Sequence, residues 1–169
     1  AIDLAQLVAR GLVRGLPEAH VHTPPRVAAR TPVERAALGY LHGNCSSCHN
    51  GQGPLARLGL RFDYPLGADA AAAGAPPALA TAVGVDSRFV RGDVRRRIVP
   101  GEPDLSVVML RLAATDPTTQ MPPFGRHLED AAAVDLFDRW IRVDLAAAPP
   151  TPCFPADSQM PFQNFQKED

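Results

Sequence analysis

The chain has 169 residues, of which 46% are hydrophobic and 21% charged, and its formal net charge is −1. A chain of this length can bury one hydrophobic core without disulfides, and its near-neutral charge argues against nucleic acid as the main partner. No stretch is long and apolar enough to span a bilayer. The odd count of three cysteines excludes an even disulfide framework.

Residues 1–30 are expected to form an N-terminal extension packed on the main domain, or a linker from something larger. A short amphipathic run comes first, and a proline-rich piece containing His20 and His22 follows it. Both histidines are expected to be surface groups. The chain begins at Ala1 without an initiator Met, which favours a processed mature protein or an excised piece.

Residues 31–147 are predicted to form one domain, which opens with a strong helix start. Thr31 is a typical N-cap, Pro32 suits the first helical position, and Glu34 is placed to close a capping box. Apolar residues then follow helical spacing at Val33, Ala37, Tyr40 and Leu41. This helix leads directly into Cys45-Ser46-Ser47-Cys48-His49.

The stretch from about residue 50 to 99 is predicted to be mostly loop, without a convincing strand. Its Gly51-Gln52-Gly53-Pro54 segment and a later Ala/Gly/Pro run, residues 67–77, disfavour a continuous core element. The insertion at residues 67–85 has no assigned role. The arginines from Arg88 to Arg97 are the best candidates for pairing with the carboxylates of a bound cofactor or for contacting an acidic partner, although most of them are expected to be solvated.

Two further helices are predicted, at residues 103–112 and 129–145. The first would place Leu105, Val108, Met109 and Leu112 on one face. The second has acids in its first turn and arginines late, which suits the helix dipole. A proline-stiffened loop containing Met121 lies between them, and residues 148–169 form a Pro-rich tail that contains Cys153, to which no role is assigned.

The CxxCH sequence indicates covalent attachment of one haem c. On a helical turn Cys45, Cys48 and His49 share a face, so two thiols could bind one porphyrin edge while the imidazole reaches the iron. A zinc site would need four ligands, and a redox dithiol would be expected beside a βαβ pattern; neither is present. We also expect the Pro54 carbonyl to accept the other ring N–H of His49, the alternative being that Gly53-Pro54 is merely a turn.

The sixth iron ligand decides the function of such a site. We predict Met121, because the two prolines after it lower the entropy lost when its loop is ordered. Met109 is expected to be a core residue, and His42 lies too close to the attachment site to reach the opposite haem face. The alternatives are Met160, His127 or an open position.

The sequence resembles class I c-type cytochromes. The likeness covers roughly residues 31–145 and rests on the capped helix into CxxCH, the Gly53-Pro54 loop, the Met121-Pro122 loop and the last helix with Trp140. The stretch from Val99 to Ser106 resembles more narrowly the bacterial haem modules attached to larger proteins. The resemblance implies an all-α cytochrome c fold with long irregular loops, in which N- and C-terminal helices cross around one haem held by His49 and Met121.

The expected function is one-electron transfer rather than catalysis, by a carrier or by an electron-entry module of a larger enzyme. The partner would be a redox protein or a fused redox domain. The alternative is a haem enzyme or gas sensor with an open or displaceable sixth site, which would need a polar group such as His127 near the iron. The family resemblance implies a periplasmic or extracytoplasmic location in bacteria.

Overall fold

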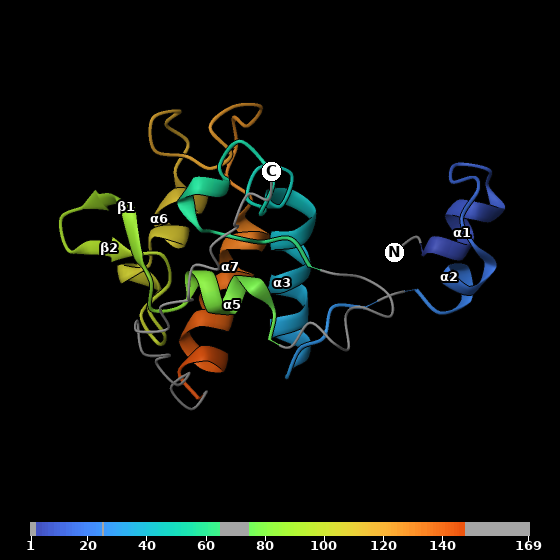
Figure 1. Ribbon diagram of the computed structural model, residues 1–169, viewed down its shortest axis with the longest axis horizontal. Helices are drawn as coiled ribbons and strands as arrows, with labels where there is room; N and C mark the ends of the chain where they lie inside the picture. The colour runs from blue at the N-terminus through green and yellow to red at the C-terminus, as the bar shows by residue number, and fades with distance from the viewer. Residues whose placement is uncertain (1–2, 25, 65–74, 148–169) are drawn as a thin grey trace, which may run out of the picture.

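The computed structural model describes residues 3–24, 26–64 and 75–147 (Figure 1). Two short helices, α1 (Leu4–Ala9) and α2 (Glu18–His22), contact each other at the N-terminal end. Figure 1 shows both lying apart from the other elements. None of the described helices is long and apolar enough to cross a membrane.

Helix α3 (Pro32–Cys45) begins as the sequence predicts. The Thr31 hydroxyl oxygen accepts the Glu34 N–H at 3.0 Å, and Pro32 occupies the first turn. The predicted capping box is wrong in one respect, because the Glu34 carboxylate binds Arg30 rather than the Thr31 N–H. It accepts the Arg30 backbone N–H at 3.0 Å and also the Arg30 guanidinium. Glu34 is thereby buried, at 1% exposure.

The last helix, α7 (Ala131–Arg139), starts at an Asp130 cap and continues as a π-helical segment, η3 (Trp140–Leu145). Both α7 and η3 pack against α3 (Figure 1). The Phe137 ring makes edge-to-face contacts with Tyr40 and Trp140, each with ring centroids 5.7 Å apart. The Tyr40–Phe137 contact joins the predicted first and last helices of the domain, and both Phe137 and Trp140 are buried in the core. Assignment to the cytochrome c fold stays a prediction.

The expectation of a strandless loop over residues 50–99 is wrong in its second half. A 3-10 turn, η1 (Ala56–Leu58), is followed by helix α5 (Pro77–Ala82) and by an antiparallel hairpin, β1 (Asp86–Arg91) and β2 (Val94–Arg96). Gly92 has φ +59°, which lets Gly92-Asp93 connect the strands between the paired Arg91 and Val94. The described residues therefore form helices and one two-stranded sheet, and the sequence analysis did not expect these strands; the all-α class stays a prediction.

The predicted helix over residues 103–112 is interrupted. A 3-10 turn, η2 (Pro103–Leu105), precedes helix α6 (Val107–Ala113), and the buried Ser106 lies between them. The Ser106 hydroxyl donates to the Glu102 carbonyl at 2.9 Å and accepts the Val99 N–H at 2.8 Å. Because the 3-10 turn interrupts the helical spacing, Leu105 is 41% exposed instead of facing the core. Met109 packs against the core as predicted.

Candidate functional site

The segment from Cys45 to His49 extends the backbone pattern of α3 by one turn. The Cys45 carbonyl accepts the Cys48 N–H at 3.2 Å and the His49 N–H at 2.9 Å. The second bond is the i to i+4 bond of an α-helix, which brings residues three and four positions apart onto one face. Two free thiols and an imidazole therefore project from the same turn.

A cavity of about 400 Å³ lies beside this turn, bounded by residues of α3, α6, α7 and the hairpin. This volume is within the roughly 300–1,000 Å³ that small-molecule and cofactor sites occupy. The cavity brings together Cys45, His49 and Met121, although Met121 is far from the other two in sequence. Cys48 is exposed and is not a lining residue. Much of the wall is apolar, including Leu41, Leu58, Phe62, Ile98, Leu112 and Phe137.

His49 is 6% exposed, and its ring packs edge-to-face against Phe62 with centroids 5.4 Å apart. Its Nδ1 atom is buried without a hydrogen-bond partner among the residues that the structure describes. Such an unsatisfied buried group costs about 1–3 kcal/mol. Burial lowers the pKa of His49, and the positive charges of Arg111 and Arg97 lower it further. The ring is therefore held neutral, which is the form that binds a metal.

The predicted hydrogen bond from His49 to the Pro54 carbonyl is not made within the described chain. Pro54 is exposed and does not line the cavity. The loop is organised instead by Asn50, whose Oδ1 accepts the N–H groups of Gln52 and Gly53 and whose Nδ2 donates to the Ser46 carbonyl at 2.7 Å. This local turn corresponds to the simpler interpretation of the Gly53-Pro54 pair.

Cys45 and Cys48 occupy different environments. Burial raises the pKa of Cys45 to about 11, with a smaller contribution from Cys48. At neutral pH the Cys45 thiol is therefore protonated, whereas a redox-active dithiol normally contains a thiolate of lowered pKa.

No group of three or more His, Cys, Asp or Glu side chains that could hold a metal ion occurs among the described residues.

Two arginines hold the Met121 loop. The Met121 N–H donates to the Arg111 carbonyl at 3.0 Å, and the Arg111 Nε donates to the Thr119 carbonyl at 2.9 Å. The Arg126 guanidinium reaches the Met121 carbonyl at 3.4 Å and also binds the Ala114 carbonyl. These contacts tie the loop to the end of α6, so the prolines after Met121 do not act alone.

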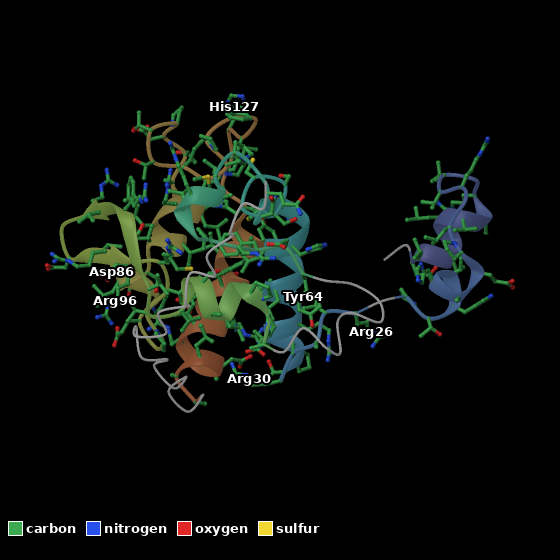
Figure 2. All side chains as sticks on the ribbon, viewed as in Figure 1. Arg26, Arg30, Tyr64, Asp86, Arg96 and His127 are labelled. Carbon is green, nitrogen blue, oxygen red and sulfur yellow. The ribbon has the colours of Figure 1, made fainter. Side chains whose placement is uncertain are left out.

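The other candidates for the sixth ligand lie outside the cavity wall or outside the described residues. Met109 belongs to the core, and the His42 Nδ1 accepts the Tyr64 N–H at 3.0 Å. His127 is exposed at the edge of the molecule (Figure 2). His20 and His22 are exposed on α2, as expected. Met160 and Cys153 lie in the tail, beyond the described residues.

Three arginines, Arg88, Arg97 and Arg111, also line the cavity, and none of the acidic residues that the structure describes does. Arg97 is committed to the fold, because its guanidinium donates to the carbonyls of Leu58, Gly59 and Thr81 at 2.6–3.0 Å. The Arg111 guanidinium lies 4.7 Å from the centre of the Phe89 ring. Arg88 makes no hydrogen bond or ion pair with the described residues. The cavity therefore combines apolar walls with guanidinium groups that can pair with carboxylates.

No known protein family, no curated protein and no solved structure matches this chain. Arg111 and Arg126 are the site residues that sequence reasoning missed, because each lies in a segment whose pattern indicated only a helix face or a loop.

Proposed function

We propose that this chain is a monohaem c-type cytochrome that transfers single electrons, either as a carrier or as an electron-entry module of a larger redox protein. The observation that carries the proposal is the meeting of Cys45, His49 and Met121 at one largely apolar cavity. The CxxCH spacing alone indicates attachment, whereas the convergence of a thioether from a distant loop provides a candidate for the opposite iron ligand.

Each residue has a specific task in this proposal. Cys45 and Cys48 would hold the cofactor through thioether bonds, and His49 and Met121 would ligate its iron. Haem c would supply a metal centre that changes oxidation state by one electron. The neutral His49 ring would ligate without first losing a proton, and it lines the same cavity as Cys45 and Met121.

The cavity wall would tune and orient the cofactor. Apolar side chains exclude water and disfavour an added positive charge, which raises the reduction potential beyond the increase expected from a thioether ligand. Arg88 and Arg111 offer guanidinium groups for two carboxylates, while Arg97 holds the wall together through backbone carbonyls. A planar, mainly apolar group with carboxylates on one edge suits this distribution.

The alternative functions have less support. An enzyme or gas sensor with an open sixth position would need a polar group close to the iron, and the predicted candidate His127 is exposed and does not line the cavity. Redox chemistry by the two thiols is disfavoured by the raised pKa of Cys45.

The test compares two conservative methionine variants of haem-loaded protein. Met121→Leu should keep covalent haem but lose the weak red absorption band of a thioether bound to ferric iron, and its reduction potential should fall. Met109→Leu removes a thioether from the core and should leave both properties unchanged. Retention of the red band in Met121→Leu, or high-spin ferric haem in the wild type, would contradict electron transfer by a His/Met-ligated centre.

A further inference from the structure

The Met121 loop continues to Asp130, which caps α7, and its outer part is held by little packing. Phe124 is 78% exposed and Leu128 is 81% exposed, so neither side chain anchors the loop in the core. Figure 2 shows His127 at the edge of the molecule, in the same outer part. A segment with few buried apolar contacts has low local stability. The position of this loop therefore depends on the contacts at its two ends.

The two ends of the loop are attached to different helices. Arg111 and Arg126 tie the first end to α6. The second end is tied to α3, because the Tyr40 hydroxyl donates to Oδ2 of Asp130 at 3.1 Å across 90 positions of sequence. The other carboxylate oxygen of Asp130 accepts the Ala133 N–H at 3.0 Å and caps α7. A single carboxylate thus joins the end of the loop, the start of α7 and a residue of α3.

The Tyr40 ring is held in place independently of this hydrogen bond. Its edge-to-face contact with Phe137 fixes the ring, and both rings line the cavity that Met121 also lines. A hydroxyl on a ring that is already fixed loses little further side-chain entropy when it binds a partner. Tyr40 is therefore suited to hold the end of the loop in one place.

The Tyr40 hydroxyl remains a donor at neutral pH. Burial raises the pKa of Tyr40 to about 12, and the hydrogen bond and the charge of Asp130 raise it as well. The phenol therefore keeps its proton, and a hydrogen bond to a carboxylate is stronger than one between two neutral groups.

We propose that Tyr40 is a positioning residue for the sixth iron ligand, because its hydroxyl closes the Met121 loop onto α3 by donating to Asp130. This inference rests on the proposed function. Loss of the hydroxyl would leave the cavity wall in place, since the ring remains, but would release the end of the loop from α3. The bound fraction of Met121 would then fall, and an external ligand would replace it more readily.

The experiment titrates the oxidised, haem-loaded protein with imidazole and follows the loss of the red thioether band. Imidazole binds only where Met121 has left the iron, so its apparent affinity rises with the fraction of protein in which the thioether is displaced. Tyr40→Phe should raise this affinity about fivefold, which corresponds to the loss of one hydrogen bond of ordinary strength.

Tyr64→Phe is the matched control, because Tyr64 is the only other tyrosine in the chain. Its hydroxyl accepts the Ala28 N–H at 3.1 Å, and it does not line the cavity. The imidazole affinity of this variant should stay within about 1.5-fold of the wild-type value, since the changed group is remote from the loop. Denaturant titration should show similar small losses of stability in both tyrosine variants, so stability alone would not explain a difference in imidazole affinity.

Asp130→Ser tests the other side of the bond. Serine keeps one oxygen for the cap of α7 but lacks the second oxygen that binds Tyr40. This variant should raise the imidazole affinity about as much as Tyr40→Phe does. The double variant Tyr40→Phe/Asp130→Ser should raise it no further than either single change, because both remove the same interaction.

An unchanged imidazole affinity in Tyr40→Phe would overturn the inference, and so would an equal rise in Tyr64→Phe. Multiplied effects in the double variant would also overturn it, since the two side chains would then act separately. High-spin ferric haem in the wild type, or a red band that persists in Met121→Leu, would instead contradict the proposed function. The two failures are therefore distinguishable.

Discussion

The cavity has two walls that are built in different ways. The α3 wall, with Cys45 and His49, is set by consecutive backbone hydrogen bonds and by packing on α7. The Met121 wall is a loop whose carbonyls are held by long arginine side chains. The first wall depends on local structure and core packing, and the second on a few polar contacts that single substitutions remove. We therefore expect haem attachment and sixth-ligand binding to be separable by mutation.

The largest expected effect comes from breaking the packing behind the α3 wall. Phe137→Ala removes a buried ring that contacts Tyr40 and Trp140, so it should lower the free energy of unfolding by about 3–5 kcal/mol. Phe124→Ala is the matched control, because Phe124 is 78% exposed and its loss should change stability by less than about 0.5 kcal/mol. Denaturant titration measures both, and similar losses would contradict the described core.

The Met121 wall is tested by Arg126→Gln. Loss of the guanidinium bonds to the Met121 and Ala114 carbonyls should cost about 1.5–3 kcal/mol and loosen the loop. The haem-loaded variant should keep its covalent haem while the red thioether band weakens. Arg139→Gln, at an exposed position without a partner in the described chain, should leave the band intact. A variant that loses haem and band together would show that the two walls are not independent.

Glu34 tests the buried anchor at the start of α3. Burial raises its pKa, but the hydrogen bonds and charge of Arg30 outweigh this and hold the pKa below the ordinary 4.5. Glu34→Gln should therefore cost about 1–3 kcal/mol at pH 7. Because the folded-state pKa is lowered, the ionised carboxylate contributes its stability above pH 4.5 and loses it as the pH falls through the folded-state value.

The free energies of unfolding of the wild type and of Glu34→Gln should therefore converge as the pH falls below 4.5. Glu129→Gln, at an exposed position, serves as the control. Its free energy of unfolding should equal that of the wild type at every pH. A constant difference between wild type and Glu34→Gln across this pH range would mean that the Glu34 charge is not involved.

The smallest expected effect is at the N-cap of α3. Thr31→Ala removes the acceptor for the Glu34 N–H and a hydroxyl that donates to Asp144, so stability should fall by about 1 kcal/mol. Thr23→Ala, at an exposed position without a side-chain hydrogen bond in the described residues, should be neutral. Thermal unfolding compares the two, and an equal effect would argue that the cap does not stabilise α3.

The sequence predicted those features whose causes are local. The Thr31-Pro32 cap, the helix leading into Cys45 and the apolar spacing of α7 are each encoded within a few residues. The hairpin was missed because its arginines suggested a solvated loop. The half-buried Ser87 and Phe89 alternate with exposed residues, but the arginines between and after them made this strand pattern hard to recognise. The Gly92-Asp93 turn was the signal that could have revealed it.

The residues of the candidate site were likewise predictable where their arrangement has a local cause. The helical turn that carries Cys45, Cys48 and His49 follows from their spacing, although only Cys45 and His49 line the cavity and Cys48 is exposed. Met121 followed from its place in a proline-stiffened loop, and the structure brings it to the same cavity. Pro54 failed because Asn50 organises its loop. Arg111 and Arg126 could not be assigned from spacing, because their partners are backbone carbonyls in an irregular segment.

Covalent haem attachment can be measured from the mass of the denatured chain after expression in a bacterial periplasm that assembles c-type cytochromes. We expect the mass to be increased by one haem, to keep this increase through unfolding, and to lose it in Cys45→Ala/Cys48→Ala. A wild-type chain with the mass of the bare polypeptide, and with Cys45 and Cys48 both open to alkylation once unfolded, would contradict it.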